Sequence, residues 1–474
     1  MKNTTTNKTG AKKVHFIGIC GVGTSALAIA LHNAGVVVTG SDKGFFPPVS
    51  TELTHAGIAY YPGWHPEKML ADGTPDFVVA GGAGTSPSNP EIVAAKEKNI
   101  PILSFAEAIG KYLVRKNSIV VAGTWGKTTS SALLSHIFES AGLDPSYFSG
   151  GVSIGRPAGA IKESDWSIVE GDEYKSAIWD PRAKFFHYKP TNLLLTAVKW
   201  DHADLYPTEA EYFEAFKKLI ASVPKTGTIV ACIDNESVVR LLTEAKRDFI
   251  SYGLNKDASY RYENIVQTPQ GITFDISYHG KKYRIESPLL GSYNAENIAG
   301  CFAMAHSCGI APGEISDAIK SFAGMKRRLE KRYENGVTVI DDIAHSPEKA
   351  RSVLNNLRHI YPGLVIAVYE PNTGNRTPQS KPAYKDAFKD ADTVVIPRLT
   401  KLKIDPSNPE KTFEGDELAD TIAESHKEVH YIEDDEELVK FLIGARSPGD
   451  VIVFLGSHGF RGMIEETVKA LAEK

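Results

Sequence analysis

The 474-residue chain contains only four cysteines, Cys20, Cys232, Cys301 and Cys308. They are too few and too widely spaced for a disulfide scaffold, and none belongs to the CxxC pair of a zinc knuckle. No apolar stretch reaches the roughly 18–20 residues that span a bilayer. The polar start MKNTTTNKTG lacks the apolar core of a signal peptide. We therefore expect reduced thiols in a soluble, cytoplasmic protein.

An excess of basic residues is also missing. The chain has 53 Lys and Arg against 58 Asp and Glu, a net charge of −5, which argues against broad binding to nucleic acid or anionic lipid. A content of 42% hydrophobic and 23% charged residues is typical of globular proteins. At roughly 150 residues per domain, the length favours about three domains.

Apolar strand patterns alternate with helical patterns along the chain, which predicts an α/β fold with mostly parallel sheets. New strand–helix units begin at residues 14, 119 and 337, after polar or basic segments at 115–118 and 324–328. The predicted domains are residues 1–117, 118–325 and 326–474.

The segment Gly123-Thr124-Trp125-Gly126-Lys127-Thr128-Thr129 has the pattern of a phosphate-binding loop, although its GxxGKT spacing is two residues shorter than the common form. It follows an apolar strand and opens a helix, so backbone N–H groups and the helix dipole favour phosphate. Lys127 would reach the β- and γ-phosphates, and the Thr128 hydroxyl would hold Mg²⁺. The alternative is a glycine turn with an incidental lysine.

Acidic and imidazole groups follow two further predicted strands. Glu170 begins the run EGDE, and His202 lies in WDHAD. In a parallel sheet both would lie near the phosphate loop, because ligands gather at the carboxyl ends of strands. Glu170 and His202 are therefore candidate metal ligands. Histidine is an unusual ligand for Mg²⁺, so His202 could instead orient a phosphate, and surface acids beside a capped helix are the plain alternative.

A second glycine loop, at residues 18–23, follows the first strand, and Asp42 ends the second. Such a loop binds a nucleotide pyrophosphate, with Gly21 and Gly23 close to it. The order is GxxGxG rather than GxGxxG, which weakens a nicotinamide-dinucleotide interpretation, and plain helix–sheet packing explains the glycines equally well.

Other candidates rest on single features. Asn294 and Asn297 share one face of a predicted helix, although helix capping explains Asn294 equally well. Arg328 suits a nucleotide phosphate or a solvated linker. Asp342 ends a strand of the third unit. Two phosphate-binding loops in two domains suit ATP with Mg²⁺ and a nucleotide-linked substrate; a nicotinamide-dependent oxidoreductase and a non-catalytic nucleotide sensor remain as alternatives.

The motifs GICGVG, VAGTWGKTTS, VEGDEY, WDHAD, YNAENIAG, KRRLE and DDIAHSP, in this order, resemble the Mur ligases, the ATP-dependent amide-bond ligases of peptidoglycan assembly. The resemblance implies a UDP-binding Rossmann-like domain, a central ATPase domain and a C-terminal Rossmann-like domain. It also implies that an acyl phosphate forms on the substrate carboxylate before an amine attacks it.

Within this family, the stretches TGSDKGFFPPVST and EGDEYKSAIWDPRAKFFHYKP most resemble the murein peptide ligases. This resemblance implies that UDP-N-acetylmuramate is joined to the recycled tripeptide L-alanyl-γ-D-glutamyl-meso-diaminopimelate. The alternative acceptor is free L-alanine, as in de novo peptidoglycan synthesis.

The resemblance also implies roles for individual residues. Lys127 would contact the ATP phosphates, and Thr128 and Glu170 would bind Mg²⁺, with His202 near a second metal. The remaining contacts would be Asn297 with adenine, Arg328 with a nucleotide phosphate, Asp342 with ribose, and Asp42 with the UDP group. Lys217 lies near the place of a carbamylated lysine that some members carry, but the subfamily resembled does not normally use it.

The sequence departs from the family pattern at three motif positions. Trp125 stands where His or Asn is usual, Gly171 replaces Ala, and Ser346 replaces a second His. The segment 370–376 also departs from the pattern expected in the third domain. These departures leave the acceptor less well defined than the reaction type.

Overall fold

The computed structural model describes residues 10, 12–45, 49–82, 86–400, 412–444 and 446–473. The chain forms two compact units. The N-terminal unit comprises Met1–Ile265, Thr273–Ser287 and Ala295–Ala323, and the C-terminal unit comprises Val266–Ile272, Pro288–Asn294 and Gly324–Lys474. Within the described ranges, no helix combines the length and apolar character needed to cross a membrane.

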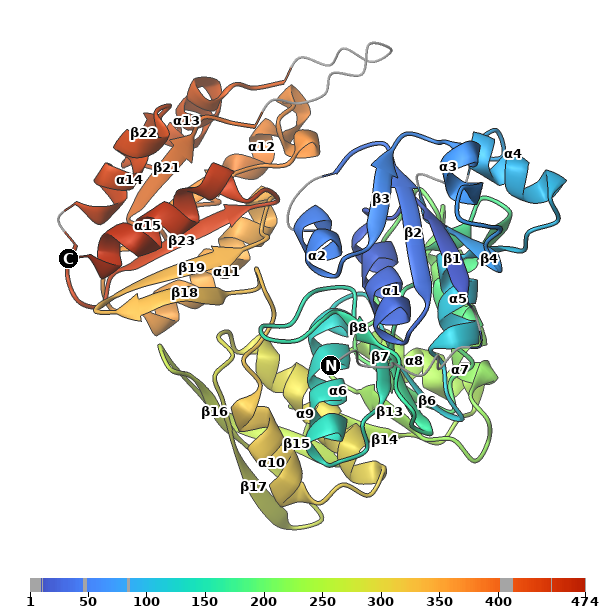
Figure 1. The fold of residues 1–474 in the computed structure, drawn as a ribbon. Coiled ribbons are helices and arrows are strands. Elements are labelled where there is room, and N and C mark those ends of the chain that lie inside the picture. Colours follow the sequence, from blue (N-terminus) through green and yellow to red (C-terminus); the bar gives the residue numbers. More distant parts are fainter. Residues whose placement is uncertain are drawn as a thin grey trace. The chain divides into compact units, whose positions relative to one another are not determined.

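The first sheet of the N-terminal unit has five parallel strands (Figure 1). Their order is β3 (Ala59–Pro62), β2 (Val37–Asp42), β1 (Lys13–Ile17), β4 (Phe77–Ala80) and β5 (Ile102–Ser104). The connecting helices are α1 (Val22–Asn33), α2 (Val49–His55), α3 (Pro66–Leu70), α4 (Pro90–Glu97) and α5 (Phe105–Tyr112). Local signals set the helix starts: Asn89 caps α4 and a Ser104–Glu107 capping box opens α5.

The second sheet has ten strands and carries the phosphate loop. Their order is β17 (Lys281–Ser287), β16 (Gly271–Tyr278), β15 (Tyr260–Thr268), β14 (Ile250–Gly253), β13 (Ile229–Cys232), β12 (Asn192–Leu195), β6 (Asn117–Ala122), β9 (Trp166–Gly171), β7 (Ser146–Phe148) and β8 (Gly159–Ala160). From β15 to β7 the pairs are parallel, and β8 is antiparallel to β7. β6 therefore lies between β12 and β9.

The helices that accompany the second sheet are α6 (Lys127–Ser140), α7 (Glu209–Ser222), α8 (Glu236–Ala245), α9 (Tyr293–Ser307) and α10 (Pro312–Ser321). A short hairpin, β10 (Lys175–Ala177) and β11 (Asp180–Ala183), and the 3₁₀ turn η2 (Lys184–His187) follow β9. Ser104 Oγ lies 2.7 Å from Ser176 Oγ, which joins the end of β5 to this hairpin.

The third sheet forms the centre of the C-terminal unit. Its order is β18 (Glu330–Asn335), β19 (Val337–Asp342), β23 (Val451–Gly456), β20 (Val365–Glu370), β21 (Thr393–Pro397) and β22 (Val429–Ile432). Only the β18–β19 pair is antiparallel among the described strands of this sheet. Its helices are α11 (Pro347–Ile360), α12 (Lys381–Tyr384), α13 (Gly415–Ala423), α14 (Asp435–Ile443) and α15 (Met463–Ala472), with 3₁₀ turns η3 (Thr373–Asn375), η4 (Pro378–Ser380) and η5 (Phe460–Gly462).

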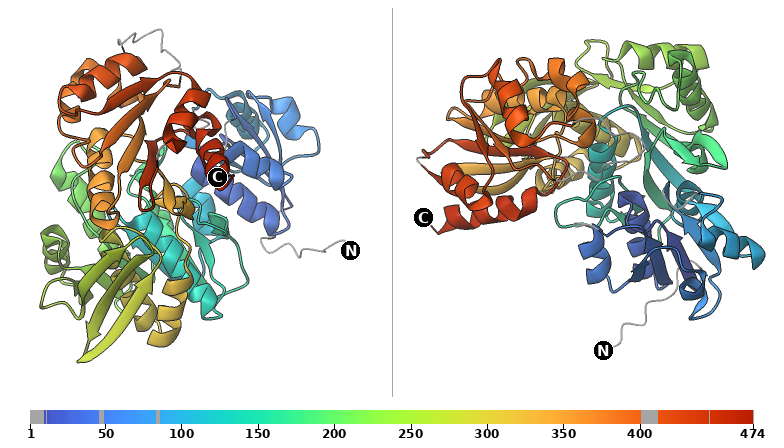
Figure 2. Two further views of the ribbon diagram at one scale, coloured as in Figure 1. Left: turned by 90° about the vertical axis from the view of Figure 1, so that its left-hand side faces the viewer. Right: turned by 90° about the horizontal axis from the view of Figure 1, so that it is seen from above.

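Both faces of the third sheet are buried. Along β20, Val365, Ala367 and Tyr369 join one apolar cluster, while Ile366 and Val368 join another. This division follows from the two-residue period of a strand, and helices lie on both faces of the sheet in Figure 2. Continuous apolar strands of this kind are typical of parallel sheets covered on both sides.

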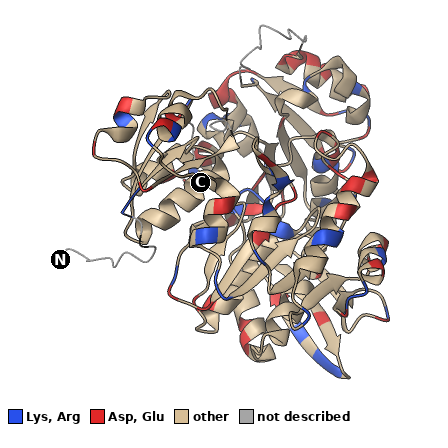
Figure 3. Ribbon diagram, turned by 90° about the vertical axis from the view of Figure 1, so that its right-hand side faces the viewer, with Lys and Arg blue, Asp and Glu red and all other residues tan. Residues whose placement is uncertain are grey.

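The predicted α/β fold class with mostly parallel sheets is confirmed. The predicted boundaries after residues 117 and 325 fall at the start of β6 and just before β18, and they stay a prediction. Basic and acidic segments are interspersed along the ribbon (Figure 3).

Candidate active site

The turn between β6 and α6 requires glycine at two positions. Gly123 and Gly126 have φ values of +143° and +81°, in the region that favours glycine. A Cβ on Gly123 would collide with the Thr196 hydroxyl, and a Cβ on Gly126 would lie 2.5 Å from Asn297 Oδ1. Thr196 Oγ1 also donates to the Trp125 carbonyl at 2.7 Å, so the end of β12 holds the turn in place.

The N-terminus of α6 suits an anion. This helix has 14 residues, no acidic residue in its first turn and no side-chain cap. Its positive dipole end and first N–H groups therefore face the glycine turn without a competing carboxylate in that turn. The predicted strand–turn–helix context of the phosphate loop is present.

Lys127 lies along the turn. Its ammonium donates to the Gly123 carbonyl at 2.6 Å and to the Thr124 carbonyl at 3.2 Å. It also forms an ion pair with Glu173 Oε2 at 2.9 Å, and the two side chains are only 13% and 1% exposed. The cation is therefore held at the mouth of the loop, where a phosphate would meet it.

Glu170 reaches the same place because of strand register. β9 pairs in parallel with β6, and Val121 lies opposite Glu170. Thr128 Oγ1 donates to Glu170 Oε1 at 3.0 Å, and the Gly150 N–H donates to the other carboxylate oxygen. Burial raises the pKa of Glu170. A hydroxyl and a carboxylate in contact are the oxygen ligands that Mg²⁺ prefers, so Thr128 and Glu170 fit this ion.

His202 lies beside Glu173 in the structure. Its Nε2 is 3.6 Å from Glu173 Oε1, and its ring meets Tyr174 edge-on with the centroids 5.4 Å apart. The backbone of His202 is strained, with φ of +55°. Tyr174 in turn donates to Asp204 Oδ2 at 2.8 Å. The two acidic motifs thus meet, as parallel strands predict.

Glu173 was not among the predicted site residues. It is 1% exposed, and its carboxylate lies within ion-pair distance of both Lys127 and His202. Burial raises its pKa, which the nearby Lys127 opposes. The available signal was its position in the acidic run that begins at Glu170, but sequence alone does not show which acid of the run turns inward.

The first glycine loop follows β1 as predicted. Asp42, at the end of β2, accepts the Cys20 N–H at 2.8 Å and the Lys43 N–H at 2.7 Å. A Cβ on Gly21 would meet the Thr24 hydroxyl at 2.5 Å, and one on Gly23 would lie 3.2 Å from the Phe105 ring. Asp42 therefore holds the loop through backbone N–H groups, and the absence of a side chain at Gly23 lets α1 pack closely against Phe105 of α5.

The two asparagines of α9 have different surroundings. Asn294 Nδ2 donates to the Leu290 carbonyl at 2.8 Å. Asn297 lies against Gly126 of the phosphate loop. Both side chains are buried. The structure thus brings Asn297 to the predicted nucleotide site and gives Asn294 a contact at the start of its own helix.

In the C-terminal unit, Asp342 uses both carboxylate oxygens for backbone contacts. One accepts the Leu329 N–H at 2.8 Å and the other accepts the Ala344 N–H at 2.9 Å, while burial raises its pKa. Arg328 is exposed. Its neighbour Arg327, whose partners the sequence does not indicate, donates to the carbonyls of Ser457 at 2.9 Å and His458 at 3.0 Å.

Three further motif positions either cap a helix or lie at the surface. Lys217 is a surface residue, 3.3 Å from Glu244 Oε2. Ser346 caps α11. The Trp125 side chain is 50% exposed beside the phosphate loop.

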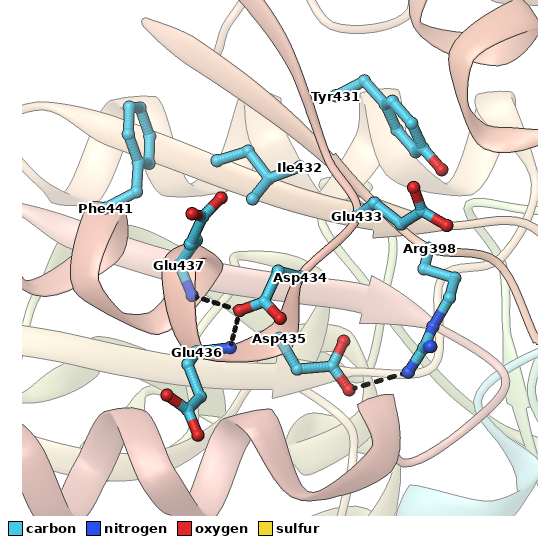
Figure 4. A pocket seen from close by; sticks show the side chains of 9 residues that line it. All are labelled: Arg398, Tyr431, Ile432, Glu433, Asp434, Asp435, Glu436, Glu437 and Phe441. Carbon is cyan, nitrogen blue, oxygen red and sulfur yellow. Dashed lines mark hydrogen bonds and ion pairs between the residues drawn. The ribbon is translucent and has the colours of Figure 1, made fainter.

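A cavity of about 860 Å³ in the C-terminal unit is lined by acidic side chains (Figure 4). Asp434 accepts the N–H groups of Glu436 and Glu437, so it caps α14. Asp435 pairs with Arg398 at 3.3 Å and with Arg461 at 2.7 Å. None of the predicted site residues lines this cavity. Two of its acids, Asp434 and Asp435, are already engaged in the helix cap and in these ion pairs.

Three family models match consecutive parts of the chain. Residues 13–117 match the Mur ligase family catalytic domain, 121–305 the Mur ligase middle domain, and 327–458 the Mur ligase glutamate ligase domain. A UDP-N-acetylmuramate–L-alanine ligase of Mesorhizobium japonicum is 32% identical, with 94% of each chain covered. A relative of the same name from Brachyspira hyodysenteriae is 30% identical over 97% of this chain and 98% of the relative.

Solved structures share the fold. The UDP-N-acetylmuramate–alanine ligase of Thermotoga maritima has a TM-score of 0.78 at 24% identity, covering 98% of this chain and 99% of that one. The UDP-N-acetylmuramate:L-alanyl-γ-D-glutamyl-meso-diaminopimelate ligase of Neisseria meningitides has a TM-score of 0.59 at 27% identity, covering 67% of this chain and 99% of that one.

The expected tripeptide acceptor is wrong. Relatives about 30% identical over nearly the full length are named for L-alanine, as is the structure with the TM-score of 0.78. In the stretch that favoured the tripeptide, Asp180 pairs with Arg182 on the same strand, β11, and with His187 in η2, each at 2.8 Å, so these side chains have partners within their own segment. In the other stretch, residues 46–48 lie outside the described residues.

Proposed function

The chain belongs to the Mur ligase family, and on that premise we propose that it joins the carboxylate of UDP-N-acetylmuramate to the amino group of L-alanine. The chain is an enzyme, an ATP-dependent carboxylate–amine ligase. The observation that carries the proposal is the meeting of Lys127, Thr128 and Glu170 at the turn after β6, in a chain whose full-length relatives are named for L-alanine.

A carboxylate does not condense with an amine in water unaided. ATP supplies a phosphoryl group, so that the substrate carboxylate becomes an acyl phosphate and ADP leaves; attack by the amine then gives the amide, phosphate and a proton. Charge on the transferred group must be neutralised, which makes electrostatic positioning the main task of the protein.

The residues around the phosphate loop suit this task. Lys127 places a cation at the mouth of the turn, and the start of α6 adds N–H groups. Thr128 and Glu170 would hold Mg²⁺, which screens phosphate charge. Asn297, which lies against Gly126, is placed to contact the nucleotide base.

The other proposed contacts lie outside the phosphate loop. The glycine loop at Gly21 and Gly23, with Asp42, would receive the UDP group. In the C-terminal unit, Arg328 would contact a nucleotide phosphate and Asp342 a ribose; since both Asp342 oxygens already accept backbone N–H groups, a ribose hydroxyl would use their remaining lone pairs.

The test is an acceptor panel with phosphate release as the readout. UDP-N-acetylmuramate and MgATP are supplied with L-alanine, glycine, L-serine or the tripeptide L-alanyl-γ-D-glutamyl-meso-diaminopimelate. We expect the highest kcat/KM for L-alanine and no acceptor-dependent release in Lys127→Ala. Release with the tripeptide alone would overturn the acceptor assignment, and release with neither would overturn the ligase proposal.

A further inference from the structure

We propose that Cys232, Asp234 and Glu296 form a binding site for a divalent cation of the zinc class, separate from the Mg²⁺ site proposed above. Cys232 ends β13, Asp234 follows two residues later, and Glu296 lies in the first turn of α9. β13 borders β12 on the side away from β6, whereas Glu170 lies on β9 beyond β6. The cluster is therefore distinct from the phosphate loop.

The three side chains converge on one point. Among the described residues, Cys232 Sγ and one carboxylate oxygen each from Asp234 and Glu296 lie within 4.8 Å of one another. Ligand atoms around tetrahedral Zn²⁺ are separated by about 3.5 Å, given bonds of about 2.0–2.3 Å. Asp234 is exposed and Glu296 half-buried. The Asp234 carboxylate accepts the backbone N–H groups of Leu254 at 2.6 Å and Asn255 at 2.9 Å, which hold it in place, so a rotation of the Glu296 side chain would bring the set to that spacing.

A buried tyrosine supplies a second, independent observation. The Tyr252 side chain is 0% exposed, and its hydroxyl has no hydrogen-bond partner in the described part of the chain. Cys232 and Glu296 are among its titratable neighbours. Its ring packs on Gly300, one helical turn after Glu296 and on the same face of α9.

An unpartnered buried hydroxyl destabilises a fold, because burial removes its hydrogen bonds to water. A cation held by the three neighbouring side chains would satisfy it, either directly or through a bound water. Tyr252 lies opposite Cys232 in the β13–β14 register, so one cation would account for both the convergent ligands and the missing hydrogen bond.

The local charge also favours a cation. Neither Asp234 nor Glu296 pairs with a basic side chain within the described ranges, and each lies near the other's negative charge. Burial raises the pKa of the Cys232 thiol, and the backbone N–H groups of Asp234 and Asn235 partly oppose this; a bound cation would displace the thiol proton. One thiolate and two carboxylates suit Zn²⁺ better than Mg²⁺, which prefers oxygen ligands alone.

Metal binding here would fasten α9 to the turn after β13. Glu296 immediately precedes Asn297, which lies against the phosphate loop. The cation would thus steady the helix that carries Asn297, without touching the reacting groups.

The experiment uses the full chain, treated with a chelator and titrated with Zn²⁺ and separately with Co²⁺, without nucleotide. We expect one equivalent of tightly bound metal and a thiolate-to-cobalt absorption band. Cys232→Ser should abolish the band and weaken Zn²⁺ binding at least about tenfold, while the matched control Cys308→Ser keeps both.

A folded Cys232→Ser protein that binds Zn²⁺ as wild type does, or a cobalt spectrum without the thiolate band, would overturn the proposal. If Cys232→Ser does not fold, Glu296→Gln serves as the second variant, and undiminished Zn²⁺ affinity there would be equally decisive. Lys127→Ala should bind Zn²⁺ normally, so failure of the ligase proposal and failure of the metal site are distinguishable.

Discussion

The ammonium of Lys127 lies 2.9 Å from Oε2 of Glu173, which is contributed by the neighbouring strand end and is almost completely buried. The same carboxylate faces His202. Glu173 therefore links the phosphate loop to the two acidic motifs, and an incoming phosphate would compete with it for the lysine.

Lys127→Ala should lower kcat for ADP formation by about 10³-fold, because it removes the cation that meets the transferred phosphoryl group. Binding of UDP-N-acetylmuramate, measured by calorimetry, should remain within a factor of two. The matched control is Lys218→Ala, which alters an exposed lysine on α7. Near-normal turnover in Lys127→Ala would remove the role of the loop.

Glu170→Gln should raise the Mg²⁺ concentration needed for half-maximal activity by about tenfold or more, because an amide is a weaker Mg²⁺ ligand than a carboxylate. The measurement is the initial rate as a function of free Mg²⁺ at saturating ATP. Glu139→Gln, in the last turn of α6, is the control. A Glu170→Gln enzyme with an unchanged Mg²⁺ requirement would argue against this ligand.

Trp125 should report nucleotide binding. Its indole is half-exposed beside the loop, so binding of a non-hydrolysable ATP analogue should remove it from water and shift its fluorescence to shorter wavelength. Trp125→Phe should lose most of this fluorescence change. Trp64 packs against the apolar cluster of the first sheet, so Trp64→Phe should keep the change. An equal response in both variants would place the nucleotide elsewhere.

Asp341 should make stability depend on pH. Burial raises its folded-state pKa to about 6, against 3.8 when unfolded, and Arg327 only partly opposes this. Between these values the folded protein keeps a proton that the unfolded chain has lost, so its contribution to stability falls as pH rises, by at most about 1.4 kcal/mol per pH unit.

Urea unfolding between pH 4 and 7 checks this sign. Asp341→Asn should remove the part of the stability that falls as pH rises. The free energy of unfolding, plotted against pH, should therefore have a more positive slope in this variant than in wild type. Asp76 is the opposite control: hydrogen bonds from the Lys13 and Lys12 backbones lower its pKa, so its stabilisation is lost as pH falls. Identical slopes for wild type and Asp341→Asn would refute the assignment.

Much of the N-terminal unit follows from local sequence signals. Apolar runs followed by glycine turns and helical patterns predict the start of the first sheet and the phosphate loop, and parallel strands predict that Glu170 and His202 approach it. These inferences use only neighbouring residues and one general property of parallel sheets.

The rest depends on contacts between distant segments. Strand order around β6, the inward turn of Glu173 and the meeting of Cys232 with Glu296 arise from packing that no local pattern specifies. The stretch that favoured the tripeptide is a further example: its letters do not show that Arg182 and His187 both pair with Asp180.

The glycine turn of the phosphate loop is confined at residues 123 and 126 and open at residue 125. Residues 123 and 126 abut Thr196 and Asn297, while the Trp125 side chain projects into solvent. In a saturation-mutagenesis map, substitutions at positions 123 and 126 would therefore be tolerated far less well than substitutions at position 125. The side chain displayed at position 125 can therefore change while the backbone of the turn stays fixed, which is how a tryptophan can stand where the resembled family usually has His or Asn.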